Sequence, residues 1–235
     1  QINDEWSYYG RLQAENDLRG DGNTGGTTVK MDNAYVKGSL MGTTATIGRF
    51  DYFLNNGMMI DSTMNGVKFE FGNQVKTAVF YGKDNNKNDA FNKYYQPATS
   101  ATYLEVTGLT MAYNTSKATL VNGGYYQYTN NDSATIFEGD DSAKVWELGF
   151  KTKFAKNWAL SGSYGASDAN QDDTAYFTQL TYKGADKTKV GSYGAWVQYR
   201  DLEANAAPKS TLAAAYAFNQ KDLGGKGYEI GFDYA

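Results

Sequence analysis

The sequence predicts an all-β protein, a transmembrane antiparallel up-and-down β-barrel, and three observations carry the prediction. Apolar and polar residues alternate with a period of two, most clearly in segment 146–154 (WELGFKTKF). This alternation recurs along most of the chain, and the alternating segments tend to end in Tyr, Trp or Phe. Successive side chains of a strand point to opposite faces, so each segment has one apolar and one polar face. Such faces suit a sheet with lipid outside and water inside.

The composition fits this class. Residues of the hydrophobic types make up 41% of the chain, without the run of about 20 apolar residues that a transmembrane helix needs. A membrane β-barrel does not need such a run, because only alternate residues of its strands face lipid. Twenty Tyr and 26 Gly against two Pro are typical of strands and turns.

Charge and missing residue types exclude several functions. The 22 basic and 26 acidic residues give a net charge of −4, which argues against a nucleic-acid partner. The chain has no Cys and no His, so disulfides, thiolate metal sites and the usual serine triad are excluded. Of the usual acid–base groups, the carboxylates of Asp and Glu remain as candidates for catalysis. We therefore predict no enzyme, no cofactor and no metal site.

Alternation and turn residues place about twelve strands along the chain. We expect them at 5–15, 28–40, 43–50, 65–71, 74–82, 100–113, 118–129, 142–154, 158–167, 173–183, 188–200 and 226–235. In 100–113 the apolar phase slips between Val106 and Leu109, which predicts a bulge near Gly108. Ser210–Tyr216 is a candidate short helix within a long connection at 201–225.

The connections alternate in length. Short turns are expected at 41–42, 72–73, 114–117, 155–157 and 184–187, and longer loops at 16–27, 51–64, 83–98, 130–141, 168–172 and 201–225. Outer-membrane barrels sort their connections in this way, with short periplasmic turns and longer extracellular loops. Gln1–Ile2 and segment 228–235 both read as strands cut in the middle. We therefore expect residues 1–235 to be one barrel domain, incomplete at both ends.

The two faces predict where lipid and water lie. Aromatic residues near strand ends fit the girdles of a membrane barrel: Trp6, Trp146, Trp158, Tyr164, Tyr193, Tyr199, Tyr228 and Tyr234. The alternative is the core of a soluble sandwich. Charged residues of both signs occupy the opposite face, which predicts a water-filled lumen, with a merely solvated strand face as the alternative. The predicted pore-lining and constriction residues are Arg11, Glu15, Lys37, Arg49, Asp51, Asp61, Lys68 and Glu70.

Segment 51–64 (DYFLNNGMMIDSTM) is the candidate constriction loop. It is too apolar to lie in water, and folding into the lumen would bring Asp51 and Asp61 toward the basic strands around Arg11, Lys37 and Arg49. The alternative is that the loop caps a neighbouring subunit. Small residues on the lipid side, namely Gly10, Ala14, Ala34 and Gly38, are the candidate subunit contact.

Four Asp/Asn clusters have the residue types of calcium ligands but not the spacing of an EF-hand. They are Asp84–Asn86, Asn130–Asp132, Asp140–Asp141 and Asp172–Asp173. Solvated loops favour the same residues, and we interpret the clusters in that way.

Three segments carry a resemblance to a known family. NDEWSYYGRLQAENDLRG (3–20), DNAYVKGSLMGTTATIGRFDYFLNNGM (32–58) and GYEIGFDYA (227–235) resemble the porin-type barrels of OmpM-like outer-membrane tether proteins of diderm bacteria. The likeness covers most of the chain and is strongest up to about residue 82. It is a likeness of strand and turn sequence, without a catalytic signature. The chain departs from the pattern in ending at Ala235 rather than at an aromatic residue.

The resemblance implies a trimeric pore of about 16 strands, which adds about two strands at each end of this chain. It also implies an N-terminal S-layer-homology domain and a coiled-coil stalk that bind peptidoglycan or a secondary cell-wall polymer. Neither segment lies within residues 1–235.

The sequence therefore predicts an outer-membrane general diffusion porin for small hydrophilic solutes and ions, forming a homotrimer in lipid. One alternative is a barrel that anchors a cell-wall tether and conducts little. Another is a soluble β-sandwich binding protein, and a third is a membrane hydrolase that uses carboxylates alone.

Overall fold

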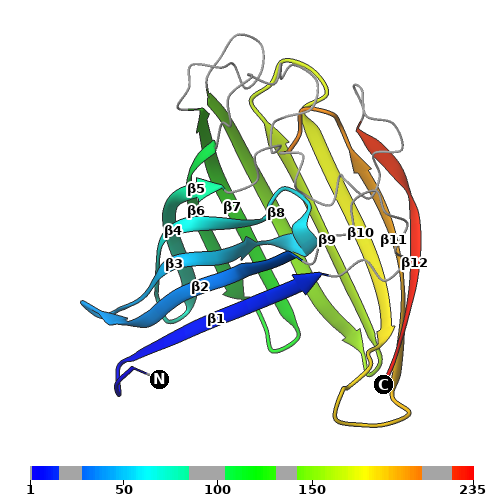
Figure 1. The fold of residues 1–235 in the computed structure, drawn as a ribbon. Helices are drawn as coiled ribbons and strands as arrows, with labels where there is room; N and C mark the ends of the chain where they lie inside the picture. The colour runs from blue at the N-terminus through cyan, green and yellow to red at the C-terminus, as the bar shows by residue number, and fades with distance from the viewer. Residues whose placement is uncertain (1, 16–27, 85–103, 131–141, 208–223) are drawn as a thin grey trace, which may run out of the picture.

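The computed structural model describes residues 2–15, 28–84, 104–130, 142–207 and 224–235. These residues form twelve antiparallel strands in one sheet, and each strand pairs with the next in the sequence (Figure 1). This is the up-and-down topology of outer-membrane barrels, and it confirms the predicted fold class. None of the helices in these ranges is long and apolar enough to cross a membrane.

The strands are 10 to 14 residues long, close to the length that crosses a bilayer at a tilt. Their bounds are β1 (Trp6–Glu15), β2 (Thr28–Leu40), β3 (Thr43–Phe53), β4 (Asp61–Phe71), β5 (Val75–Asp84), β6 (Leu104–Asn114), β7 (Thr119–Asn130), β8 (Ser142–Ala155), β9 (Trp158–Ser167), β10 (Thr174–Lys183), β11 (Tyr193–Leu202) and β12 (Gly225–Tyr234). A short 3₁₀ turn, η1 (Asn55–Gly57), joins β3 to β4.

Two predicted boundaries were wrong. The hairpin of β3 and β4 is longer than predicted, so only residues 54–60 of segment 51–64 lie outside strands. The turn after β10 runs over 184–192, because β11 begins at Tyr193 rather than at residue 188. Hydrogen bonds from the Asp186 backbone to Ser192 and from Thr188 to Asp186 hold these residues in a turn instead of a strand. The candidate helix Ser210–Tyr216 lies outside the described residues.

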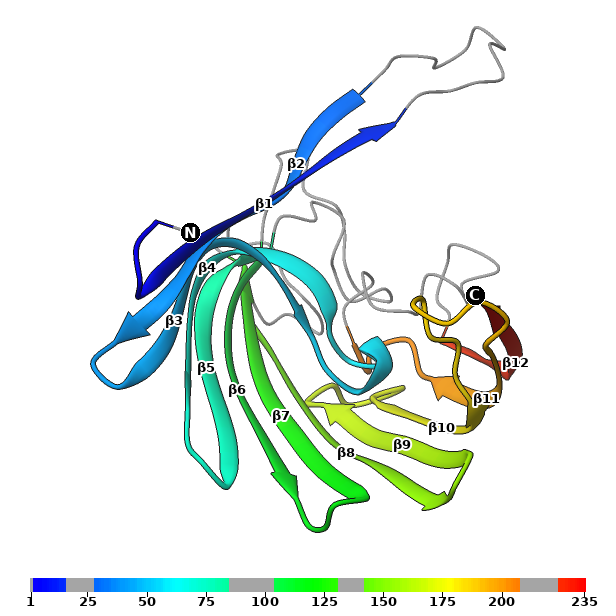
Figure 2. The same ribbon diagram turned by 90° about the horizontal axis from the view of Figure 1, so that it is seen from below.

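The sheet is strongly curved and forms part of a barrel wall. Figure 2 shows β3 to β12 following a curve, while the free ends of β1 and β2 extend away from it. Within the described ranges β1 and β12 are not paired with each other, so the sheet is open between them. The tip of the β3–β4 hairpin lies inside the curve (Figure 2).

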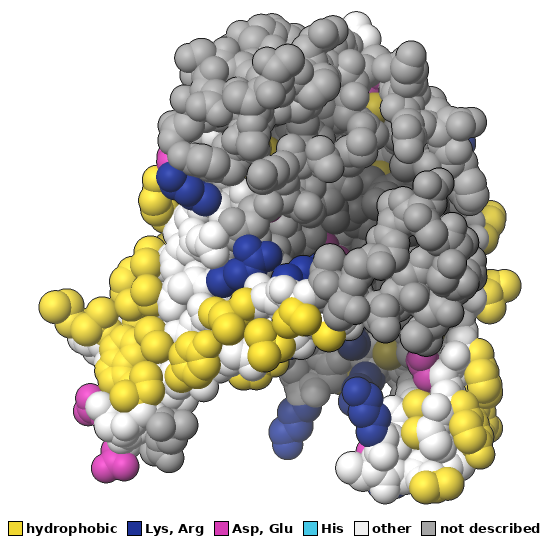
Figure 3. Space-filling view, in the orientation of Figure 1, with side chains coloured by type: hydrophobic (Ala, Val, Ile, Leu, Met, Phe, Trp, Pro, Cys, Tyr) yellow, Lys and Arg dark blue, Asp and Glu magenta, His cyan; other side chains and the backbone are white. Residues whose placement is uncertain are grey.

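The outer face of the sheet is apolar and exposed. Leu148 and Phe150 of β8 have exposed fractions of 63% and 38%, so they are not packed in the protein interior. Large apolar side chains are exposed on the outer face of the other strands too, among them Ile47, Val79, Leu109, Val121, Val197 and Ile230. In Figure 3 hydrophobic side chains lie along the flanks of the molecule, and Lys and Arg side chains lie in the hollow at its centre. A face of this kind is stable against hydrocarbon rather than water.

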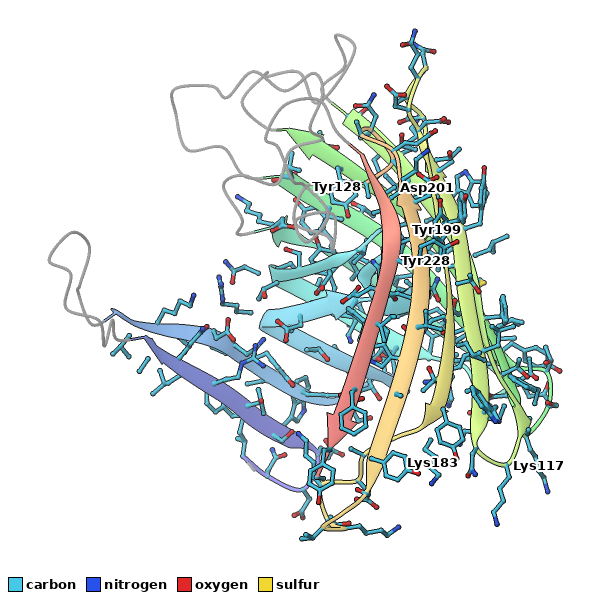
Figure 4. The ribbon with its side chains drawn as sticks, turned by 90° about the vertical axis from the view of Figure 1, so that its right-hand side faces the viewer. Lys117, Tyr128, Lys183, Tyr199, Asp201 and Tyr228 are labelled. Atoms are coloured by element: carbon cyan, nitrogen blue, oxygen red, sulfur yellow. The ribbon has the colours of Figure 1, made fainter. Side chains whose placement is uncertain are left out.

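Two belts of aromatic rings border this face on β8 to β12. One lies toward the short turns and consists of Trp158, Tyr182, Tyr193 and Phe232, whose successive ring centroids are 4.7, 6.5 and 6.4 Å apart. The other consists of Trp146, Tyr164, Tyr176, Tyr199 and Tyr228, of which Tyr199 and Tyr228 are labelled in Figure 4. From Trp158 to Tyr164 along β9 is about 20 Å. This arrangement matches the two interfacial girdles of a membrane barrel.

The predicted bulge at Gly108 was wrong. Pairing of β6 with β5 and β7 runs through Gly108 without a register shift, and Gly108 lies opposite Phe80 on the inner face. A Cβ at Gly108 would overlap the Phe80 ring, so the glycine makes room for that ring. Leu104 and Val106 are apolar because they belong to a buried cluster on the inner side. In this register Glu105 shares the outer face with Leu109.

This packing gives a first prediction. Replacing Gly108 by valine should destabilise the barrel by about 1–3 kcal/mol, because overpacking forces a well-packed cluster apart. Replacing Gly227 by valine is the matched control, since no atom lies within 4 Å of the added Cβ. The free energies of unfolding in urea should differ between the two variants. Equal values would show that Gly108 does not serve the Phe80 ring.

Candidate functional site

The tip of the β3–β4 hairpin packs against the inner wall of the sheet. Met58 and Met59 are fully buried, and Ile60 is 2% exposed. Met59 lies over Gly165 of β9, where a Cβ would come within 3.1 Å of its Cγ, and Asn55 lies over Gly149 of β8. The tip thus reaches from β3 and β4 across to β8 and β9, as the apolar composition of the segment predicts.

A buried carboxylate holds the tip in this position. Glu147 of β8 is 1% exposed and accepts a hydrogen bond of 2.8 Å from the Asn55 amide nitrogen. The Tyr126 hydroxyl donates to the same carboxylate at 3.0 Å and the Ser163 hydroxyl at 3.4 Å. Residues of β7, β9 and the 3₁₀ turn η1 therefore all bind the Glu147 side chain of β8. Burial of a carboxylate is tolerated when its oxygens are satisfied in this way.

A second polar contact fixes the base of the tip. Asp84 at the end of β5 is buried and accepts hydrogen bonds from the Tyr52 hydroxyl at 2.5 Å and the Ser62 hydroxyl at 2.8 Å. The Tyr52 ring also packs against the Phe80 ring, with 5.8 Å between centroids. One face of the hairpin is thereby held on the wall.

The opposite face of the hairpin carries the predicted acidic residues. The Asp51 carboxylate accepts hydrogen bonds of 2.9 Å from Asn33 and from Thr63, and it lies 3.6 Å from the Arg11 guanidinium. Arg11 also forms an ion pair with Asp32. Asp51 and Arg11 are thus brought together as the sequence predicts.

Asp61 forms no ion pair within the described residues. It lies in the electrostatic field of Asp51 and of Arg200 on β11. Arg200 is 1% exposed and its guanidinium lies 5.3 Å from the centre of the Phe177 ring. The hairpin therefore brings acidic groups toward basic groups on two separated parts of the wall, β1 and β11.

A charged triad lies on the inner face below the tip. The Glu70 carboxylate is 3.4 Å from the Lys37 ammonium and 3.5 Å from the Lys68 ammonium. Lys68 also lies 5.6 Å from the centre of the Phe50 ring. Lys37, Glu70 and Lys76 line a cavity of about 580 Å³ together with Leu54 beside the tip. Two of the predicted pore residues, Lys37 and Glu70, thus line a solvent-accessible space, and a third, Lys68, contacts Glu70.

The remaining predicted residues are placed as follows. Arg49 donates a hydrogen bond of 2.8 Å from Nε to the backbone oxygen of Asp32. Glu15 ends β1, and its side chain lies outside the described residues. Asn55, Tyr126 and Ser163 were not singled out from the sequence. Their partners are up to 92 residues away, and no local signal marks such pairs. Asp84 was singled out only as part of a solvated loop cluster, and this was wrong because its side chain is buried.

Of the small residues predicted for a subunit contact, Gly10 and Ala14 are exposed, Ala34 is half-buried and Gly38 is buried. The Trp6 ring covers Gly38, which is buried within the chain, and the Tyr8 side chain lies beside Gly10. The ring of a strand neighbour therefore occupies the space that a second subunit would need at Gly38.

The described residues contain no group of three or more Asp, Glu, His or Cys that could hold a metal ion. Most of the four Asp/Asn clusters lie outside the described residues. Asp172–Asp173 is described, and the backbone oxygens of both residues accept hydrogen bonds, from Asn205 and Ser167, that shape a turn.

The geometry of the site as a whole offers fixed charges and hydrogen bonds along the hollow inner side of the sheet.

Comparisons with known proteins bear on the fold. No protein-family model matches the chain, and no curated protein matches it. The solved structure of OccK7 (OpdD) of Pseudomonas aeruginosa is similar over 90% of this chain and 58% of its own, with a TM-score of 0.52 and 11% identity. The trimer form of OmpT, an outer-membrane protein of Vibrio cholerae, matches 99% of this chain and 87% of its own, with a TM-score of 0.48 and 13% identity. At these identities the likeness to OccK7 shows the fold of an outer-membrane β-barrel.

Proposed function

We propose that the protein is a passive outer-membrane porin that lets small hydrophilic solutes and ions diffuse through the barrel. One observation carries the proposal: a hairpin tip with an acidic face is fixed inside a sheet whose outer face is apolar. In a membrane pore the apolar outer face contacts lipid and the charged inner face contacts water. The outer-membrane location follows from the same argument.

Selection in this pore is by size and charge. The hairpin tip narrows the space, while Asp51 faces Arg11 and Glu70 faces Lys37 and Lys68. Opposed charges across a narrow zone set a field through which a solute passes down its gradient. No bond is made or broken, so the protein is not an enzyme and needs no cofactor.

A second candidate is a structural anchor that conducts little. A cluster of buried apolar residues around the hairpin tip, which includes Met58, Tyr126, Val145 and Phe177, fills part of the interior. The resemblance to OmpM-like proteins supports a role in tethering the outer membrane to the cell wall, in a homotrimer and through segments outside this chain. A tether of that kind works with or without a pore.

Conductance in planar lipid bilayers separates the two candidates. A porin gives ohmic steps, whereas an anchor with a filled interior gives none. Replacing Lys68 by glutamate should then shift the reversal potential toward the value expected for a cation-selective pore. A change of two charges about 8 Å from the ion path is worth about 1 kcal/mol in water, or about a five-fold change in the permeability ratio.

The control for this shift is Lys117→Glu. Lys117 lies in the turn between β6 and β7, away from the hairpin tip (Figure 4). The control should keep the wild-type reversal potential. Equal shifts in both variants would mean that Lys68 does not lie at the narrow zone.

A further inference from the structure

A groove of about 710 Å³ lies at the short-turn end of the barrel, outside the candidate constriction. The turn between β8 and β9 forms one side and the segment 184–192 forms the other. A backbone hydrogen bond of 2.6 Å from Lys183 to the Asn157 oxygen ties the two sides together. The groove is therefore a formed feature of the fold rather than a gap between independent loops.

Four lysines line the groove against one acidic residue. They are Lys153, Lys156, Lys183 and Lys189, and the acid is Asp186. The Lys189 ammonium lies 3.1 Å from the Asp186 carboxylate. Hydrogen bonds from the Thr188 hydroxyl and backbone amide lower the pKa of Asp186, so this carboxylate is ionised and neutralises only Lys189. Within the described chain, Lys153, Lys156 and Lys183 form no ion pair.

One lysine is fixed by aromatic rings. The Lys183 ammonium lies 4.2 Å from the centre of the Tyr193 ring and 5.3 Å from that of Tyr182, and it donates to the Tyr193 hydroxyl at 2.9 Å. An ammonium has three donors, so a donor remains for a ligand beside the contacts with Tyr193 and Tyr182. Cation–π contacts hold the charge in place at the groove.

The groove adjoins the outer apolar face. Trp158 and Tyr193 line it, and both belong to the aromatic belt at this end. Beyond the belt, along the strands, the outer face continues with uncharged side chains such as Leu160, Leu180 and Val197. Aromatic belts mark the depth of lipid headgroups, so the lysines lie at headgroup level.

We propose that this groove binds the phosphate of an anionic phospholipid, whose acyl chains lie along the outer face of β9 to β11. The cluster of three cations without a carboxylate partner fits a phosphate and a second negative charge. The continuity of the groove with an apolar face favours a lipid over a free phosphate ion or a polyanionic polymer. The inference rests on the membrane location in the proposed function but not on conduction.

Lipid retention in detergent tests the proposal. The chain is purified in a neutral detergent and given an equimolar mixture of phosphatidylglycerol and phosphatidylcholine with identical acyl chains. Native mass spectrometry then counts the lipids that stay bound. The wild type should prefer phosphatidylglycerol, and Lys156→Gln should reduce the preference about five-fold, the effect of one lysine at a lipid surface. The double variant Lys156→Gln/Lys183→Gln should abolish it.

Lys117→Gln is the matched control, because Lys117 lies in another short turn at the same end of the barrel (Figure 4). It should keep the wild-type preference. Equal retention of the two lipids by the wild type, or equal losses in Lys156→Gln and Lys117→Gln, would overturn the proposal. Displacement of phosphatidylglycerol by excess inorganic phosphate alone would assign the groove to small anions instead. Because retention needs no pore, an absence of conductance would count against the proposed function and not against this site.

Discussion

Replacing Met59 by aspartate is expected to release the hairpin tip from the barrel interior and to raise single-channel conductance several-fold. Met59 is fully buried against β9. An unpaired carboxylate at this position costs more than about 3 kcal/mol, which the tip avoids by moving into the water of the lumen. Planar-bilayer recordings of the variant and the wild type measure the change.

Phe53→Asp is the control for the added charge. Phe53 is next to the same tip but is 58% exposed, so a carboxylate there needs no movement of the hairpin. The control should alter ion selectivity while conductance stays close to that of the wild type. An equal rise in both variants would mean that charge, rather than displacement of the tip, controls the current. Unchanged conductance in Met59→Asp would mean that the tip does not narrow the path.

Replacing Glu147 by alanine is expected to remove the main polar contact between the tip and the wall. The substitution leaves the donors of Asn55, Tyr126 and Ser163 without their acceptor. Each unsatisfied buried donor costs about 1–3 kcal/mol, and water that enters the site can satisfy some of the donors. The free energy of unfolding should therefore fall by about 3 kcal/mol. Denaturant unfolding measures the loss, and bilayer recordings should show added current noise from a mobile tip.

Two further variants identify the cause of that loss. Glu147→Gln keeps one acceptor oxygen, so it should recover part of the stability. Lys151→Ala removes an exposed charge from the same face of β8 and should change the free energy of unfolding by less than about 0.5 kcal/mol. If Lys151→Ala were as destabilising as Glu147→Ala, the hydrogen-bonded carboxylate would have no special role.

The sheet itself could be predicted from the sequence because a strand has a fixed period of two. Each apolar–polar alternation, as in 146–154, specifies both the strand and its faces, and the hydrogen-bonded register confirms it. The position of the hairpin tip could be predicted for a similar reason. Met58, Met59 and Ile60 are costly to leave in water, whatever they pack against.

The failures around the hairpin tip have a common cause. The slip in apolar phase around Gly108 predicted a bulge because the prediction took every residue on the inner face of a strand to be polar. Leu104 and Val106 are apolar on that face because the distant hairpin tip covers them. The anchor at Glu147 depends on the same long-range packing, since Asn55 and Glu147 are 92 residues apart. Local patterns contain no information about such contacts.

The absence of cysteine from the chain allows the most direct test of the central claim, that alternate residues face hydrocarbon and water. Single cysteines at 148 to 153 of β8, in the protein reconstituted in lipid vesicles, are treated with a membrane-impermeant thiol reagent. We expect rapid reaction at 151 and 153, protection at 148, 150 and 152, and slow reaction at 149, which lies under Asn55 of the hairpin tip. Equal reaction at all six positions, or protection at 151 with reaction at 148, would contradict a barrel with lipid outside and water inside.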